Sequence, residues 1–166
     1  LDTVRKFARR ALKENYAEFR EWIPRLDGWA IKEILILEPK LIAELYPSVR
    51  EKLDEESRRE IVSKALSLRG KLRRKILSKL EAKEYIWIWS HMAPEDKKTL
   101  RKSIWVEVLE LKPEYAKESP FDDIKAVAYA RCGEFDKAFR MINEDRNLLP
   151  KIEDTLPEEF LVHILR

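Results

Sequence analysis

The fold is decided by a stretch that occurs twice, EILILEP over residues 33–39 and EVLELKP over residues 107–113. In both copies an apolar segment starts at a glutamate and ends at a proline, which cannot continue the hydrogen-bond ladder of a helix. The copies lie 74 residues apart, which corresponds to two periods of about 37 residues. We interpret each proline as closing the second helix of a pair, whose apolar face the next pair buries.

Two fainter copies extend this pattern. The stretch LSLRGKL over residues 66–72 carries glycine where the others carry proline, and Pro150 repeats the closing position. The spacings between Pro39, Gly70, Pro113 and Pro150 are 31, 43 and 37 residues, so the period is irregular. Chance similarity is the alternative, because leucine, glutamate and proline are common in this chain.

Hydrophobic periodicity predicts helices along the whole chain. The first expected helix begins at Asp2 or Thr3, carries an apolar stripe to Phe19 and ends before Pro24. Tyr85–Trp89 has high strand propensity, but no second segment could pair with it, so it is expected to be helical. The other expected helices cover residues 29–38, 41–46, 54–69, 71–83, 94–111, 121–132 and 135–143, with a last one in the tail after residue 148.

No segment is typical of a hairpin or a βαβ unit, so the expected fold is all-α. We expect antiparallel helix pairs stacked as a short right-handed α-solenoid, and an irregular helical bundle is the alternative. The 166 residues suit one helical-repeat domain over residues 1–166. The chain does not begin with methionine and ends within an apolar run, so the sequence is also compatible with a piece of a longer protein.

One stretch carries a family resemblance, AYARCGEFDKAFRMINE over residues 128–144 followed by Pro150. It resembles a tetratricopeptide or pentatricopeptide repeat, and the match covers residues 119–152. The matching positions are a turn glycine, an aromatic residue after it, a small residue where two helices touch, a large apolar residue and a closing proline, here Gly133, Phe135, Ala138, Ile142 and Pro150. The resemblance implies antiparallel helix pairs whose groove binds peptides or, in the pentatricopeptide branch, RNA.

The match has departures. Asp122 and Lys125 stand where the first helix of such a repeat carries large apolar residues. Residues 82–113 can be laid on the same frame, but Asp96 replaces the turn glycine and Arg101 replaces the small residue. These departures leave open whether the bound partner is a peptide or a nucleic acid.

Composition narrows the class of protein. Hydrophobic residues make up 45% and charged residues 39%, a balance that favours a folded chain over a disordered one. The chain has no glutamine and few asparagines beside abundant lysine, arginine and glutamate, a pattern typical of thermophilic proteins. A single cysteine, Cys132, excludes an internal disulfide and a cysteine-cluster metal site. No apolar stretch approaches the roughly 20 residues that span a bilayer, so we expect a cytoplasmic protein without membrane contact.

Positive charge gathers in three places. Residues 64–83 hold eight basic residues and one acid, and residues 97–102 and 5–13 form two further clusters. Residues 107–160 carry 14 acids and eight bases. In nucleic-acid-binding proteins, basic side chains bind phosphates and nearby aromatic rings stack on bases. A net charge of +3 is far below the strongly positive charge that is usual for such proteins.

We therefore predict a non-enzymatic helical-repeat scaffold that binds another protein or a peptide. The alternative is a nucleic-acid-binding helical module that uses the basic region 64–102. Trp29, Trp89 and Trp105 lie on apolar stripes and are expected in the core, whereas Trp87 lies off the stripe and is the expected exposed anchor. The candidate partner-binding residues are Arg73, Arg74, Lys75, Lys98, Arg101 and Trp87.

Signals of catalysis are weak. His91 and His163 are the only histidines and lie 72 residues apart, without the spacing of a zinc site. Cys132 precedes the turn glycine and is expected to pack as a small hydrophobic residue. Three scattered glycines cannot build a phosphate-binding loop. We predict no catalytic residue, no metal and no cofactor.

Overall fold

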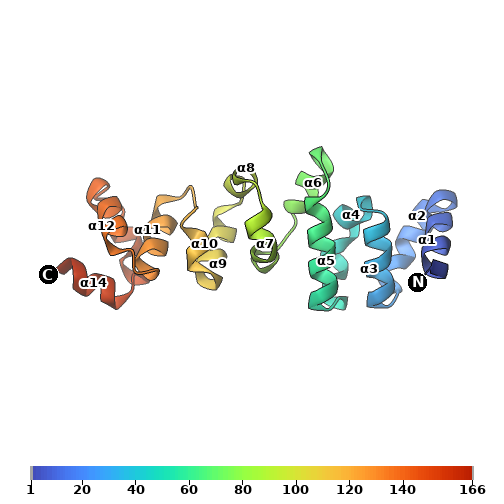
Figure 1. Ribbon diagram of the computed structural model, residues 1–166, viewed down its shortest axis with the longest axis horizontal. Coiled ribbons are helices and arrows are strands. Elements are labelled where there is room, and N and C mark those ends of the chain that lie inside the picture. The colour runs from blue at the N-terminus through green and yellow to red at the C-terminus, as the bar shows by residue number, and fades with distance from the viewer. Residues whose placement is uncertain (1, 166) are drawn as a thin grey trace. The chain divides into compact units, whose positions relative to one another are not determined.

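The computed structural model describes residues 2–165, and these residues are all-α (Figure 1). Fourteen α-helices and four short 3₁₀ turns follow one another, and no β-strand occurs in the described part of the chain. Contacts group the protein into two compact units, Leu1–Leu80 and Glu81–Arg166. The expected all-helical class is therefore confirmed, and an irregular helical bundle fits it. A single domain over residues 1–166 stays a prediction.

The first unit contains three helix pairs. They are α1 (Asp2–Glu14) with α2 (Tyr16–Trp22), α3 (Gly28–Leu37) with α4 (Lys40–Val49), and α5 (Glu55–Leu66) with α6 (Gly70–Leu77). The helices of each pair contact each other, α3 also packs against α1 and α5, and α4 packs against α6. The central pair supplies fully buried side chains such as Ile31, Leu35, Leu41 and Ile42. Each contributes about 1.5–3 kcal/mol by leaving water.

Three helices begin at a constant spacing along the chain. Asp27 and Asp54 are the N-cap residues of α3 and α5, and Glu81 is the N-cap of α7 (Ala82–Ile88) in the second unit. Each has an extended backbone and follows a leucine, and the spacing is 27 residues in both intervals. The period of about 37 residues expected from the sequence is therefore wrong for this part of the chain.

Pro39 and Pro113 do not close the second helix of a pair, contrary to expectation. Pro39 lies between α3 and α4, and Pro113 begins α10 (Pro113–Ala116) directly after α9 (Lys102–Leu111). Glu38 and Lys112, the residues before them, have similar backbone angles (φ −125°, ψ 87° and φ −151°, ψ 80°). The two copies of the repeated stretch thus end corresponding first helices. The proline lets the second helix start because its missing N–H needs no partner there.

The first expected helix is two helices. Asn15 leaves the helical region (φ −140°, ψ 52°) between α1 and α2. The chain then packs α2 against α1, and the rings of Phe7 and Phe19 meet edge to face at 6.1 Å. The apolar stripe predicted as one continuous face is therefore the contact between two helices.

Pro47 lies inside α4, although the sequence predicted that the helix ends before it. A helical residue 47 would donate its N–H to the carbonyl of Ala43, four residues earlier, and proline has no N–H. The ammonium of Lys79 takes that role, because its Nζ lies 2.6 Å from the Ala43 oxygen. A tertiary hydrogen bond thus replaces the lost helical one, which local sequence rules cannot anticipate.

The second unit continues with short helices. After α7 come α8 (Pro94–Lys98), α9, α10, α11 (Asp122–Arg131), α12 (Phe135–Glu144), α13 (Leu149–Ile152) and α14 (Glu158–Leu165). Pro94 occupies the first turn of α8, and Gly133, with φ 79°, joins α11 to α12, as predicted. The helix expected over 94–111 is split at Thr99, whose hydroxyl donates to the Asp96 carbonyl at 2.7 Å and ends α8.

An aromatic cluster forms part of the core of the second unit. Trp89 and Trp105 are buried, as predicted, and their rings stand perpendicular at 5.2 Å. Tyr115 stacks on Trp89 at 5.3 Å. The prediction for Trp29 is wrong, because 53% of it is exposed. The start of α3 approaches the Lys52 backbone at Gly28 and not at Trp29, because a Cβ at residue 28 would lie 2.6 Å from the Lys52 carbonyl oxygen.

We expect the Lys79 bond to depend on Pro47. Replacing Lys79 with alanine leaves the Ala43 carbonyl without its partner and should lower the free energy of unfolding by about 1 kcal/mol. In a Pro47→Ala background the same replacement should cost much less, because the new N–H can bond to Ala43. Urea unfolding of the four proteins of this double-mutant cycle measures the coupling. Equal costs in the two backgrounds would contradict the assignment.

Candidate interaction site

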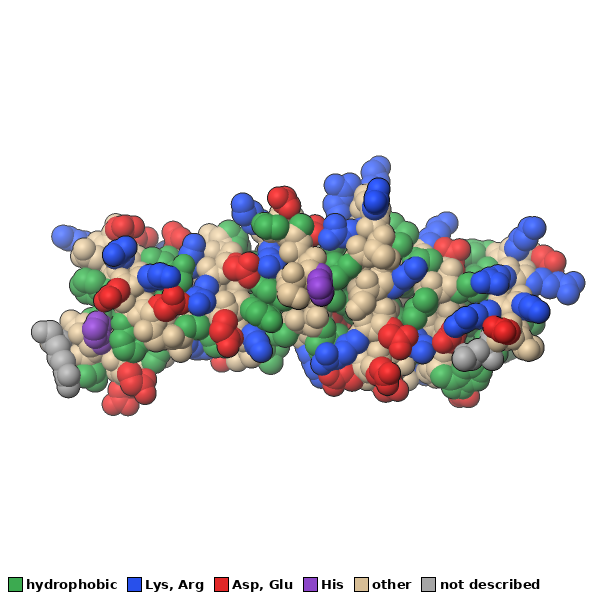
Figure 2. Space-filling view, viewed as in Figure 1, with side chains coloured by type: hydrophobic (Ala, Val, Ile, Leu, Met, Phe, Trp, Pro, Cys, Tyr) green, Lys and Arg blue, Asp and Glu red, His purple; other side chains and the backbone are tan. Residues whose placement is uncertain are grey.

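A cluster of cations at α6 is the candidate site. Arg69 is the N-cap of α6, and Lys71, Arg74 and Lys75 follow within its two turns; these four residues are called the α6 cluster. All four are exposed, and none makes an ion pair or a side-chain hydrogen bond with the described residues. Lys and Arg side chains gather at this helix in Figure 2. These four exposed cations make α6 the candidate surface for an anionic partner.

The charge of the surrounding unit reinforces the cluster. Residues 1–80 contain 20 bases and 13 acids, a net charge of +7. Residues 81–166 contain 14 bases and 18 acids, a net charge of −4. The net +3 of the chain therefore hides two units of opposite sign. The field of the first unit favours an anionic partner at α6.

The predicted partner-binding residues divide between the units. Arg74 and Lys75 belong to the α6 cluster, whereas Arg73 on the same helix is half-buried and already engaged by a neighbouring group. Lys98 and Arg101 are exposed in the second unit. Trp87, also in the second unit, is half-buried, with the Lys83 ammonium 5.7 Å from its ring centre. It is therefore less open than an exposed anchor.

Lys97 does not belong to a solvated basic face, although the sequence placed it in the second cluster. It is 9% exposed, and its Nζ lies 3.0 Å from Glu118 Oε1 and 4.9 Å from the ring centre of Trp89. Trp89 Nε1 donates to the other oxygen of Glu118. Lys97 thus balances a carboxylate that the aromatic cluster needs, and it is unavailable to a partner.

Groups that could carry chemistry lie apart. No three His, Cys, Asp or Glu side chains within residues 2–165 lie where they could hold a metal ion together. His91 and His163 are exposed. Cys132 is half-buried, less packed than expected. Burial raises the pKa of its thiol, although the Lys117 ammonium opposes the shift, so the thiol stays protonated at neutral pH and is a weak nucleophile.

The departures from the repeat resemblance line a hollow in the second unit. Asp122 and Lys125 lie with Tyr129 and Arg140 around a depression of about 410 Å³ between α11 and α12. Side chains that face an open hollow need not be apolar, which explains the charged residues at these positions. Ala138, the predicted small residue, is fully buried where α12 packs against α11.

Comparison with protein-family models, curated proteins and solved structures finds no match. Of the helices in residues 2–165, none is both long enough and apolar enough to span a bilayer. The assignment of function therefore depends on the geometry and charges of the protein itself.

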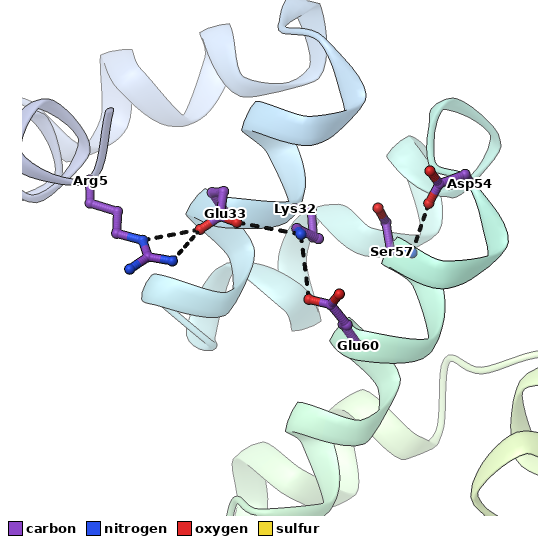
Figure 3. A network of polar contacts seen from close by, with 6 residues as sticks. All are labelled: Arg5, Lys32, Glu33, Asp54, Ser57 and Glu60. Carbon is purple, nitrogen blue, oxygen red and sulfur yellow. Dashed lines mark hydrogen bonds and ion pairs between the residues drawn. The ribbon is translucent and has the colours of Figure 1, made fainter. Parts of the chain in front are cut away.

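A polar network joins the first helices of the three pairs in the first unit (Figure 3). Arg5 of α1 donates two hydrogen bonds, of 3.0 and 3.1 Å, to one oxygen of Glu33 on α3. Lys32 lies 3.4 Å from the other oxygen of Glu33 and 3.4 Å from Glu60 on α5. Asp54 caps α5 by accepting from the Ser57 N–H at 2.8 Å. Sequence analysis missed this network, whose only signal is charge at matched positions of successive pairs.

The network fixes the ionisation of its members. Burial opposes the charge of Glu33, but hydrogen bonds from Arg5 and Lys32 outweigh it and hold the pKa of this carboxyl below its usual value. Burial likewise opposes the charge of Lys32, and Glu60 and Glu33 together raise its pKa. The hydrogen bond from Ser57 lowers the pKa of Asp54. Both carboxylates therefore remain charged well into the acidic range.

We expect Glu33 to make stability depend on pH. A carboxyl whose pKa is lower in the folded state contributes stability above its unfolded pKa and loses it as pH falls through the folded value. Glu33→Gln should therefore lower the free energy of unfolding by about 1 kcal/mol at pH 7 and by progressively less as pH falls below about 4. Glu107→Gln is the matched control, because Glu107 on α9 is exposed and makes no ion pair within residues 2–165. A Glu33→Gln deficit that stays constant down to pH 2 would contradict this account.

Proposed function

We propose that this chain is a non-enzymatic scaffold that binds an acidic segment of another protein through the α6 cluster. The observation that carries the proposal is the set of four exposed cations at α6, which form no ion pair within residues 2–165 and belong to a unit of net charge +7. Arginine binds carboxylates in a bidentate manner, and Arg69 and Arg74 supply two such groups. Steering by the field of the unit speeds the encounter with an acidic partner.

The scaffold itself is proposed to be a short right-handed α-solenoid of the tetratricopeptide or pentatricopeptide kind. Packing of α3 against both α1 and α5, and of α4 against α6, supports this arrangement for the first unit. The hydrogen bonds from Arg5 to Glu33 and from Tyr16 to Glu44, each between residues 28 apart, support it as well. The left-handed Gly133 between α11 and α12 is compatible with the turn of such a repeat.

The lack of aromatic residues in the sequence around α6 favours a protein partner over a single-stranded nucleic acid. No Phe, Tyr or Trp occurs between Tyr46 and Tyr85, a stretch that contains all of α5 and α6. Proteins that bind single strands stack bases on aromatic rings, worth about 1–3 kcal/mol per base. The α6 cluster offers charge without such a platform. The nucleic-acid-binding module of region 64–102 is therefore the second candidate.

Two labelled probes separate these candidates by fluorescence anisotropy. One is a glutamate- and serine-rich peptide of about 12 residues, and the other is an oligouridylate of about 12 nucleotides, both in about 50 mM salt. We expect the peptide to bind at least as tightly as the RNA. Arg74→Glu with Lys75→Glu should weaken peptide binding by about tenfold or more.

The matched control is Arg146→Glu with Lys151→Glu. These two cations are exposed in the second unit, and their reversal changes the net charge equally. We expect the control to bind the peptide like the unaltered chain. Equal weakening by both variants would show that only net charge matters and would contradict the α6 site. Tighter RNA binding, with a steep salt dependence lost in the α6 variant, would favour the nucleic-acid module.

A further inference from the structure

Phe7 on α1 is an exposed aromatic residue with basic residues near it in the sequence. It is 66% exposed, and its ring stands nearly perpendicular to that of Phe19, with the ring centres 6.1 Å apart. Arg10 lies one helical turn away on the same face. Lys6, Arg9 and Lys13 are also exposed, and none of these three makes an ion pair within residues 2–165. Basic side chains therefore flank Phe7 on one side of α1, where Arg10 is already paired with Glu14 at 3.3 Å.

The second unit carries a surface of complementary character on α12 and α14. A hollow of about 420 Å³ is lined by Phe135, Glu158, Glu159, Val162 and His163. Phe135 packs against Phe160 at 5.5 Å and against His163 at 5.2 Å, which gives the hollow an aromatic wall. Val162 is 44% exposed. Glu158 and Glu159 are exposed and have no partner in the described chain.

Capping alone does not explain this hollow. Carboxylates in the first turn of a helix are stabilised by the helix dipole, which accounts for Glu158 and Glu159. The dipole gives no reason for Val162 to stand exposed one turn later beside an aromatic wall. Apolar groups rimmed by charge are typical of surfaces that bind a partner.

We propose that the α1 face of one copy docks into the α12–α14 hollow of a second copy. Phe7 fills the hollow, which is large enough for an aromatic ring, because binding pockets of about 300–1,000 Å³ hold whole ligands. The exposed ammonium groups of Lys6 and Lys13 then face Glu158 and Glu159 across the contact. The opposite net charges of the two units, +7 and −4, favour this pairing over contact between like units.

The contact joins two different surfaces, so in a pair of copies one keeps a free hollow and the other keeps a free α1 face. Such a heterologous contact extends from copy to copy unless its rotation closes a ring. The inference goes beyond the proposed function, because the α6 cluster takes no part in it. Self-association and peptide binding can therefore be measured and can fail independently.

Sedimentation velocity at protein concentrations up to about 200 µM tests the contact. We expect the average mass to rise with protein concentration, either without limit or up to that of a closed ring. Raising the salt from about 50 to 500 mM should weaken the association severalfold, because it screens the charges around Phe7. A chain that stays monomeric throughout this concentration range would overturn the proposal.

Two single variants identify the surfaces. Phe7→Glu places a carboxylate against the acidic rim, and Val162→Glu adds one inside the hollow, so each should weaken self-association by at least about tenfold. Val106→Glu is the matched control, because Val106 on α9 is 46% exposed and lies on neither surface. It should associate like the unaltered chain. Equal loss in the control would overturn the assignment of the surfaces.

Mixing the two variants gives the sharpest outcome. Phe7→Glu retains an intact hollow and Val162→Glu retains an intact Phe7, so an equimolar mixture should form a one-to-one dimer that grows no further. Circular dichroism melts establish that each variant is folded, and Phe7→Ser with Val162→Ser replaces the pair if a glutamate variant is not. A mixture of folded variants that remains monomeric would contradict a contact between these two surfaces.

Discussion

Packing of each helix pair on the next is the constraint on which the first unit depends. Its helices have 7 to 13 residues, and isolated helices shorter than about 12–15 residues are marginal in water. Their stability must therefore come from packing against neighbouring helices. The central helices α3 and α4 have neighbours on several sides and bury almost fully apolar faces, whereas α1 leaves Phe7 exposed to solvent. Two hydrogen bonds, from Arg5 to Glu33 and from Tyr16 to Glu44, fix how the first pair is aligned with the second, because both join residues 28 apart. Apolar burial supplies the energy, and the polar contacts set which residues of successive pairs meet.

The same packing decides which charges are free to act. Lys32, Lys79 and Lys97 are held by carboxylates or by a carbonyl within the fold, so they serve its stability. The side chains of the α6 cluster make no ion pair within residues 2–165, and residues 61–80 contain no acid at all. A surface whose charge the fold leaves unbalanced is available to a ligand of opposite charge. The proposed roles in partner binding and self-association both follow from this distinction, although they use different helices.

The sequence predicted the existence of most helices, and it predicted those starts and ends that local chemistry controls. Asp54 caps α5, Pro94 opens α8 and Gly133 adopts the left-handed conformation between α11 and α12, because each depends on the residue itself and its nearest neighbours in the sequence. Pro47 and Trp29 were mispredicted, because a distant lysine and a close backbone contact at Gly28 decide their surroundings. The recurring pair of leucine and acid at 26–27, 53–54 and 80–81 was present in the sequence and would have given the correct spacing. Within the candidate site, Arg74 and Lys75 could be predicted from the density of positive charge in the sequence alone. The burial of Lys97 and the exposure of Phe7 could not be predicted, because both depend on how the helices pack.

Native-state hydrogen exchange on a core variant tests the central claim most directly. In a row of stacked pairs each pair depends mainly on its neighbours, so damage at one position stays local. Ile61 is fully buried in α5, and Ile61→Ala should cost about 2–4 kcal/mol. The account predicts that amide protection falls in α3, α5 and α6, falls less in α1, and is unchanged in α11 and α12. An equal fall in every helix, as expected for one cooperative globular core, would contradict it.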